Sequence, residues 1–138
     1  MGYSDMDYAG KSFEAHDVDL AVWMNYVVRA IDRMEDRPRW LAESREDWNS
    51  QATGGFGFGI MPGLDKHVTD DRKDTMLSLF RQALAEMERH GDMMTVDELN
   101  SLKPKGPNAV FAGDLPMETF RKVGRRATDL LEGRDPEP

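Results

Sequence analysis

Four side chains near the middle of the chain could bind a metal ion. His67 is followed by Asp70, Asp71 and Asp74, and Asp70 and Asp74 share one face of a predicted helix because they lie four residues apart. Carboxylate oxygens of this kind can hold a divalent cation. Acidic residues at a helix start also cap the helix and interact favourably with its dipole. The second explanation is the simpler one, so we predict no metal ion and no other cofactor.

No motif in the sequence specifies a covalent reaction. Cysteine is absent, which excludes a thiol nucleophile and Cys-ligated metal sites. No serine lies in a Gly-x-Ser-x-Gly turn, and His16, His67 and His90 form no His-x-x-x-His pair. A Ser–His–Asp triad could still assemble in space, because triads are defined by geometry and not by chain order. We leave enzymatic activity open and favour a protein that is not an enzyme.

The segment Gly54–Gly63 matches neither a helical pattern nor a simple loop. It alternates glycine with Phe56, Phe58 and Ile60 between two predicted helices, and Met61 begins a turn. It contains neither a phosphate-loop motif nor the dinucleotide spacing of glycines. Three interpretations remain open: a connector whose rings fill the core, a loop that binds a partner or ligand, and a mobile lid over a site. Because aromatic residues dominate interface hot spots, we predict that Phe56, Phe58, Ile60 and Met61 contact a partner.

The charge of the chain points to a basic partner. The formal net charge is −8 and the sequence pI is about 4.8, with the acidic excess concentrated in residues 1–101. A negative body repels phosphate, so direct nucleic-acid binding is unexpected, whereas it attracts basic proteins. We therefore predict that Asp70, Asp71 and Asp74 complete the partner-binding surface. Plain solubility is the alternative explanation for the charge.

A basic strip runs against this trend. Arg121, Lys122, Arg125 and Arg126 lie on one exposed side of a predicted helix. The strip could contact nucleic acid or an acidic partner, or pair with the acidic surface of its own chain or of a second subunit. Four charges are few compared with the phosphate contacts of true DNA-binding proteins.

Apolar periodicity predicts a mostly α fold: a compact bundle of four to five helices with an irregular Gly/Phe-rich connection. Residues 1–16 are expected to form a polar lead-in, and residues 109–111 a brief extended piece. Residues 1–132 are expected to form one helical domain, and residues 133–138 a disordered tail. The five helices are expected to span about residues 17–35, 38–49, 70–90, 96–102 and 116–131, the fourth with a Thr95–Glu98 capping box and the last capped by Asp114.

Three functions are compatible with these observations. The first is a small acidic protein-binding module in the cytoplasm, such as a stoichiometric inhibitor, an immunity-type protein or a phage anti-defence protein that occupies a basic surface of its target. The second is a ligand- or metal-binding helical enzyme with a pocket under Gly54–Gly63. The third is a homo-oligomeric structural or regulatory component. The acidic N-terminus lacks an apolar stretch, so neither a signal peptide nor membrane insertion is expected.

Overall fold

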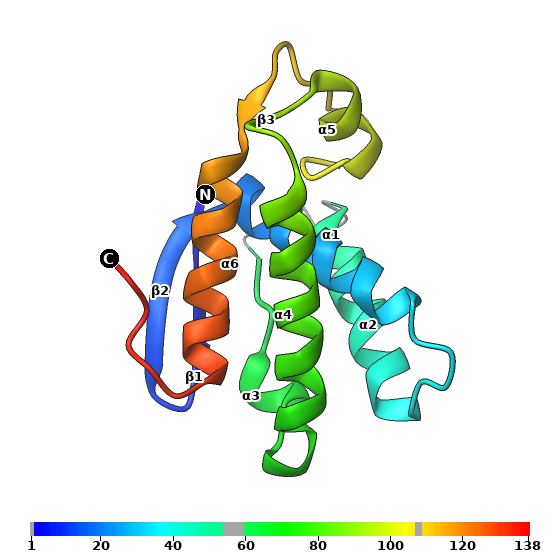
Figure 1. Ribbon diagram of the computed structural model, residues 1–138, viewed down its shortest axis with the longest axis vertical. Coiled ribbons are helices and arrows are strands. Elements are labelled where there is room, and N and C mark those ends of the chain that lie inside the picture. Colours follow the sequence, from blue (N-terminus) through cyan, green and yellow to red (C-terminus); the bar gives the residue numbers. More distant parts are fainter. Residues whose placement is uncertain (1, 54–59, 107–108) are drawn as a thin grey trace.

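A computed structural model describes residues 2–53, 60–106 and 109–138. In this part of the chain six α-helices, one short 3-10 helix and two small antiparallel sheets are present (Figure 1). The predicted fold class, a compact and mostly α structure, is confirmed. The glycine–phenylalanine alternation of residues 54–59 lies outside the described residues.

Residues 3–16 form a β-hairpin, so the predicted polar lead-in is wrong. Strand β1 (Tyr3–Tyr8) pairs with β2 (Lys11–His16) in an antiparallel register that sets Met6 opposite Phe13. Ala9 and Gly10 make the two-residue turn, and both have positive φ (52° and 85°), as a type I′ turn requires. One face of the hairpin buries apolar side chains, which secures the register against a one-residue slip.

Helix α1 (Asp17–Asp32) is the central element of the fold. It is predicted correctly except that it ends three residues earlier than expected, and it packs against α2 (Arg39–Ala52), α4 (Lys73–Arg89) and α6 (Met117–Leu131). Most of its side chains are buried, including the rings of Trp23 and Tyr26. A helix that is apolar on nearly all sides is typical of the interior of a bundle.

Two short helical pieces stand between α2 and α4. Helix α3 (Leu64–His67), which the sequence analysis did not expect, is followed by the 3-10 helix η1 (Asp70–Arg72). Thr69 occupies the position before η1, but its hydroxyl donates to the Asp71 carboxylate and caps no backbone N–H. Long helix α4 therefore begins at Lys73, one turn later than predicted.

Helix α5 (Val96–Leu102) and a two-residue ladder close the upper end of the molecule in Figure 1. The predicted capping box is confirmed, because Thr95 Oγ1 accepts from Glu98 N while Glu98 Oε1 accepts from Thr95 N. Strand β3 (Met93–Met94) pairs with β4 (Leu115–Pro116), whereas residues 109–111 belong to no strand. Asp114 accepts from Val96 N at the start of α5, so the prediction that it caps α6 is wrong.

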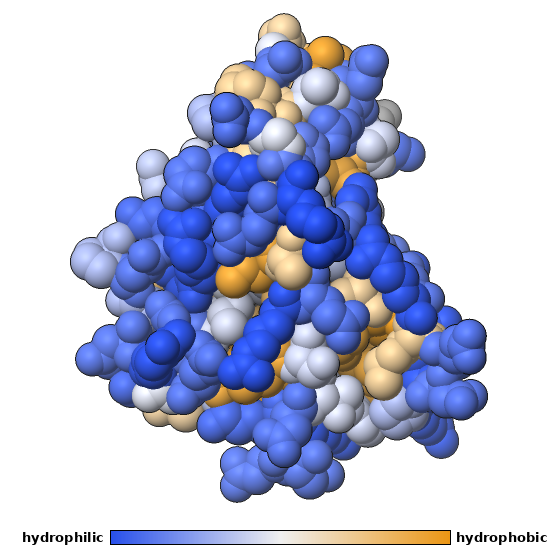
Figure 2. Space-filling model, in the orientation of Figure 1, coloured by the Kyte–Doolittle hydropathy of each residue, from blue (hydrophilic) through white to orange (hydrophobic). Residues whose placement is uncertain are grey.

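The buried side chains form one hydrophobic cluster to which both strands of the hairpin and all six described helices contribute. Hydrophilic side chains cover most of the face in front of α4 and α6, with apolar strips between them (Figure 2). Among the described helices, none combines the length and the hydropathy that a bilayer span requires.

Residues 133–138, for which the sequence predicts disorder, make several contacts. Arg126 Nε donates to Glu137 O at 2.9 Å, and Arg125 Nε donates to Glu137 Oε1 at 2.7 Å. At the other end of the segment, Lys11 Nζ donates to Gly133 O and lies 3.0 Å from Asp135 Oδ1. The segment therefore contacts both α6 and the hairpin.

Candidate functional site

Ile60 and Met61, two of the predicted partner-binding residues, lie in opposite environments. Ile60 is buried in the core, and its amide donates to Ser4 Oγ at 3.0 Å. Met61 is 77% exposed, and its amide donates to Gln51 Oε1 at 2.8 Å. The side chain of Ile60 therefore faces the core rather than a partner, whereas Met61 offers most of its surface. Phe56 and Phe58 lie outside the described residues.

Asp70, Asp71 and Asp74 are exposed at the foot of α4. The hydrogen bond from the Thr69 hydroxyl lowers the pKa of Asp71, which keeps that carboxylate charged. In the described ranges no three His, Cys, Asp or Glu side chains are placed to hold a metal ion. Arg72 and Lys73 lie between Asp71 and Asp74 in the sequence, so the local charge is mixed. No described contact joins them to Met61.

His67 forms a hydrogen-bonded chain with a serine and an aspartate. Its Nδ1 lies 2.7 Å from Ser44 Oγ, and its Nε2 lies 2.7 Å from Asp47 Oδ2. The partners are those of a catalytic triad, but Ser44 is fully buried and its hydroxyl also lies 3.0 Å from Trp40 O. A substrate carbonyl cannot reach an inaccessible hydroxyl, so this geometry does not support nucleophilic catalysis at Ser44.

Side chains of α2 next to this hydrogen-bonded group also hold Met61 and Pro62, which follow the glycine-rich segment. Trp48 Nε1 donates to Pro62 O at 2.8 Å, and Gln51 holds the Met61 amide while its own Nε2 donates to Asp47 Oδ1. The Trp48 ring also meets the His67 ring edge to face, with 5.0 Å between centroids. Buried polar networks of this kind, fully hydrogen-bonded, favour a single backbone arrangement. Their role here is structural anchoring.

A surface that the sequence analysis missed is the outer face of the hairpin. Asp5, Asp7 and Glu14 are exposed on this face, and Asp5 lies directly opposite Glu14 in the strand register. Within the described ranges none of the three lies within 4.0 Å of a lysine or arginine nitrogen. We call these three residues the acidic hairpin face. The signal for it was the alternation of charged and apolar residues on both sides of Ala9–Gly10.

The four residues of the basic strip on α6 make different contacts. Arg121 donates to the carbonyls of Met87, His90 and Gly91, so it caps the C-terminus of α4. Arg125 pairs with Glu118 and Glu137 at 2.6 and 2.7 Å. Lys122 and Arg126 have no carboxylate within ion-pair distance in the described part of the chain, and both face a hollow beside the hairpin.

This hollow has a volume of about 520 Å³ and lies where the open end of the hairpin meets α1, α6 and the connection after α5. The hairpin runs alongside α6 in Figure 1. Three cations and three aromatic rings line the hollow, which we call the basic hollow. They are Tyr3, His16, Lys105, Phe111, Lys122 and Arg126.

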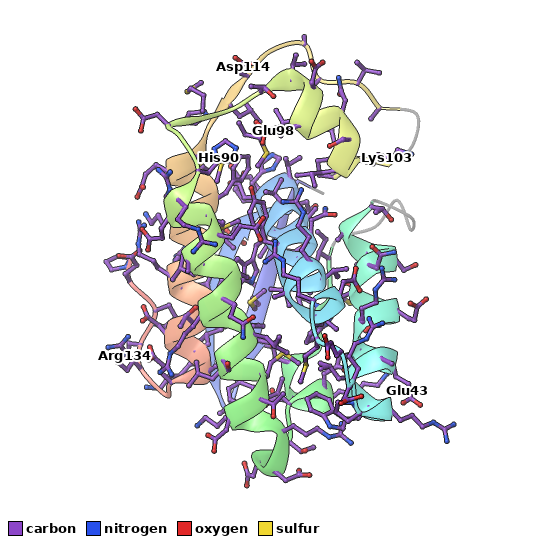
Figure 3. All side chains as sticks on the ribbon, turned by 45° about the vertical axis from the view of Figure 1, so that its right-hand side comes forward. Glu43, His90, Glu98, Lys103, Asp114 and Arg134 are labelled. Atoms are coloured by element: carbon purple, nitrogen blue, oxygen red, sulfur yellow. The ribbon has the colours of Figure 1, made fainter. Side chains whose placement is uncertain are left out.

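His90 and Glu98 form a second histidine–carboxylate contact, between the end of α4 and α5. Their Nε2 and Oε2 atoms are 2.7 Å apart, and Figure 3 shows the two side chains next to each other below α5. The hydrogen bond to Glu98 raises the pKa of His90, and the same bond lowers the pKa of Glu98. The pair joins α5 to the bundle and lies away from the basic hollow.

Comparisons with protein-family models, with curated proteins and with solved structures give no match to this chain. Its function must therefore be inferred from its own residues.

Proposed function

We propose that the chain is a protein-binding module that occupies a basic surface of its target, and that the acidic hairpin face is its main contact. The observation that carries this proposal is the juxtaposition of Asp5 and Glu14. Like charges directly opposite each other destabilise a strand pair, and no cation of the described chain neutralises them. Lysine or arginine side chains of a partner would relieve that repulsion on binding.

The rest of the molecule supports the same function. The net charge of −8 speeds encounter with a basic protein by long-range attraction. The hairpin is a firm platform, because its inner face is packed in the core and its turn is held by the bond from Ala9 N to Asp65. A stoichiometric inhibitor of the immunity or phage anti-defence type, acting in the cytoplasm, fits this chemistry. Met61, exposed at 77%, remains a predicted apolar contact of the partner.

Affinity capture with paired variants tests the proposal. The bait is the full chain, and the test variant is Asp5→Asn/Glu14→Gln, which removes two charges from the acidic hairpin face. The matched control is Glu88→Gln/Asp97→Asn, which removes two exposed charges from α4 and α5. Native host lysate is passed over each bait at low and at moderate salt, and retained proteins are quantified.

We expect one basic protein in stoichiometric amount on the wild type and on the control, and its loss from the hairpin variant and at moderate salt. Retention of the same protein by all three baits would overturn the hairpin as the contact surface. A lysate that yields no stoichiometric protein on any bait would overturn protein binding as the function.

A further inference from the structure

The basic hollow has the size and lining of a small-molecule site. Its volume of about 520 Å³ falls within the range of roughly 300–1,000 Å³ found for ligand pockets. Apolar side chains of Val18, Leu115 and Val123 contribute to its lining. Thr119, Lys122, Val123 and Arg126 recur at three- and four-residue steps, so one face of α6 forms a whole wall.

The cations of the basic hollow are available to a ligand. Lys105 and Lys122 are exposed, and neither lies within ion-pair distance of a carboxylate in the described ranges. Among the described residues, Arg126 donates to the backbone carbonyls of Glu137 and Glu14 and to no carboxylate, and it stacks on the Phe13 ring at 4.7 Å. Three positive charges thus converge on one hollow of a protein whose net charge is −8.

Flat rings stand beside these charges. Tyr3 meets His16 edge to face with 5.2 Å between ring centroids, and Lys105 lies 5.0 Å from the centroid of Phe111. Tyr3 is 61% exposed, so much of its ring is open to contact. Aromatic side chains of this kind can stack on the ring of a ligand.

Two polar groups could orient such a ring. His16 Nδ1 accepts from Val18 N at 3.2 Å, which assigns the proton of a neutral imidazole to Nε2 and makes that atom a donor. Asp19 also lines the hollow, and burial raises the pKa of its carboxyl. In the described part of the chain the Asp19 side chain accepts no hydrogen bond, so it is free to accept one from a ring N–H.

We propose that the basic hollow binds a mononucleotide, with the phosphate at Lys105, Lys122 and Arg126 and the base against Tyr3 and Phe111. A long nucleic-acid strand is disfavoured, because three cations cannot offset the repulsion from an acidic body. A bare anion would leave the rings and Asp19 without a partner. The hollow adjoins the acidic hairpin face, because Tyr3 and His16 lie two residues along the strands from Asp5 and Glu14, but the two sites share no residue. The calorimetric test uses no protein partner and the capture test no nucleotide, so the two proposals can fail independently.

Isothermal titration calorimetry of the full chain at low salt tests the site. The ligands are AMP, GMP, CMP and UMP, with adenosine and inorganic phosphate added separately to measure each half of the recognition. We expect at least one monophosphate to bind with a Kd below about 0.3 mM, and adenosine and phosphate to bind at least tenfold more weakly. Amide chemical shifts should change around Tyr3, His16 and residues 119–126.

Lys122→Gln is the informative variant, because this exposed side chain makes no described hydrogen bond and we expect its loss to leave the fold intact. We expect it to weaken the nucleotide at least fivefold, while Lys66→Gln, an exposed lysine on α3, changes nothing. Phe111→Leu should weaken nucleotide and adenosine alike. The site is overturned if no monophosphate binds below 1 mM, if phosphate alone binds as tightly, or if the two lysine variants behave alike.

Discussion

The contact between His90 and Glu98 makes the stability of the protein depend on pH. His90 has a raised pKa in the folded protein. Its contribution to the free energy of unfolding is therefore complete below the pKa that His90 has in the unfolded chain, and it is lost as pH rises through the folded pKa. Glu98 has a lowered pKa in the folded protein. Its contribution to the free energy of unfolding is therefore complete above the pKa that Glu98 has in the unfolded chain, and it is lost as pH falls through the folded pKa. The two conditions overlap between the unfolded pKa values of glutamate and histidine, at about pH 5–6.

The variant Glu98→Gln isolates this effect, because glutamine can still serve the capping box with Thr95. We expect the variant to be less stable than the wild type at pH 5.5, by less than about 1 kcal/mol because Glu98 is partly exposed. The difference should shrink at pH 8. Urea unfolding at both pH values measures it, and a difference that is the same at both would refute the ion pair.

Ser44→Ala tests whether the buried chain of Ser44, His67 and Asp47 is a structural anchor. The substitution removes a hydroxyl that lies 2.7 Å from His67 Nδ1 and leaves that nitrogen without a partner. We expect a loss of about 1–2 kcal/mol in the free energy of unfolding. The matched control is Ser50→Ala, an exposed serine of the same helix, which should be neutral. Equal stability of the two variants would remove the anchoring role.

At the scale of single residues, contacts within one turn of helix can be predicted from the sequence, whereas contacts between distant elements cannot. The Thr95–Glu98 capping box is readable because both partners lie within one turn of chain. The contact of Ser44 and Asp47 with His67 is not, because the glycine-rich segment separates their elements and only the tertiary fold brings them together. The role of Arg121 could not be predicted either, because its three carbonyl acceptors lie at the end of α4, far from Arg121 in the sequence.

Among the elements, the long helices were predictable, whereas the short helix α3 and the hairpin were not recognised. Long helices with regular three- and four-residue apolar steps carry a strong signal, which α1, α4 and α6 all have. The hairpin strands are only six residues long, and their turn is Ala9–Gly10 rather than the more characteristic Asn-Gly. Alanine rarely adopts the positive φ found at Ala9, so the turn gave a weak signal.

Gly124 controls how closely α6 approaches α1. A Cβ at this position would lie 2.9 Å from a ring carbon of Trp23 and 3.0 Å from a methyl of Leu84. We expect Gly124→Ala to reduce stability by about 1–3 kcal/mol, although alanine is the better helix former. Urea unfolding measures the loss.

Gly91→Ala is the matched control, because its Cβ would meet no atom within 4 Å. This variant should unfold at nearly the same urea concentration as the wild type. A Gly124→Ala variant as stable as Gly91→Ala would mean that α6 can move away from Trp23 at no cost.

The hairpin should become more stable when its like-charge pair is replaced. Asp5→Lys places a cation directly opposite Glu14 on the exposed face. We expect a gain of about 0.2–1 kcal/mol at low salt, decreasing as salt rises. Asp7→Lys, opposite Ser12, is the control for net charge and should gain less. An equal gain from both would indicate relief of the overall negative charge rather than of this pair.

The charges of the whole molecule are segregated in a way that composition does not reveal. A net charge of −8 suggested one acidic surface, yet Lys105, Lys122 and Arg126 gather at one hollow beside the acidic hairpin face. The walls of the hollow come from four separated parts of the chain: Tyr3, residues 15–19, the group of Lys105, Phe111 and Leu115, and residues 119–126. No local pattern links these parts of the chain, so the hollow could not be predicted from spacing, and only the basic strip of the last predicted helix indicated a positive surface.

This segregation assigns a modulating role to the last residues of the chain. Asp135 and Glu137 bring two negative charges to the same side of the molecule, next to Lys11, Arg125 and Arg126. We expect Glu137, whose backbone carbonyl accepts from Arg126, to lower the positive potential that an anion meets at the basic hollow, and Asp135, which pairs with Lys11 at the turn end of the hairpin, to contribute little. A unit charge about 10 Å away in water changes the affinity for a singly charged anion by about twofold.

Asp135→Asn/Glu137→Gln should therefore tighten nucleotide binding by about twofold at low salt, mainly through Glu137, with less effect at 0.5 M salt where the Debye length is short. Calorimetry with the best-binding monophosphate measures this. Glu35→Gln/Asp36→Asn is the control, because it removes the same charge from the connection between α1 and α2, on the side of the molecule opposite the C-terminus in Figure 1. An equal gain from both variants would mean that only net charge matters, whereas a gain confined to the first would show that the C-terminal acids act locally on the hollow.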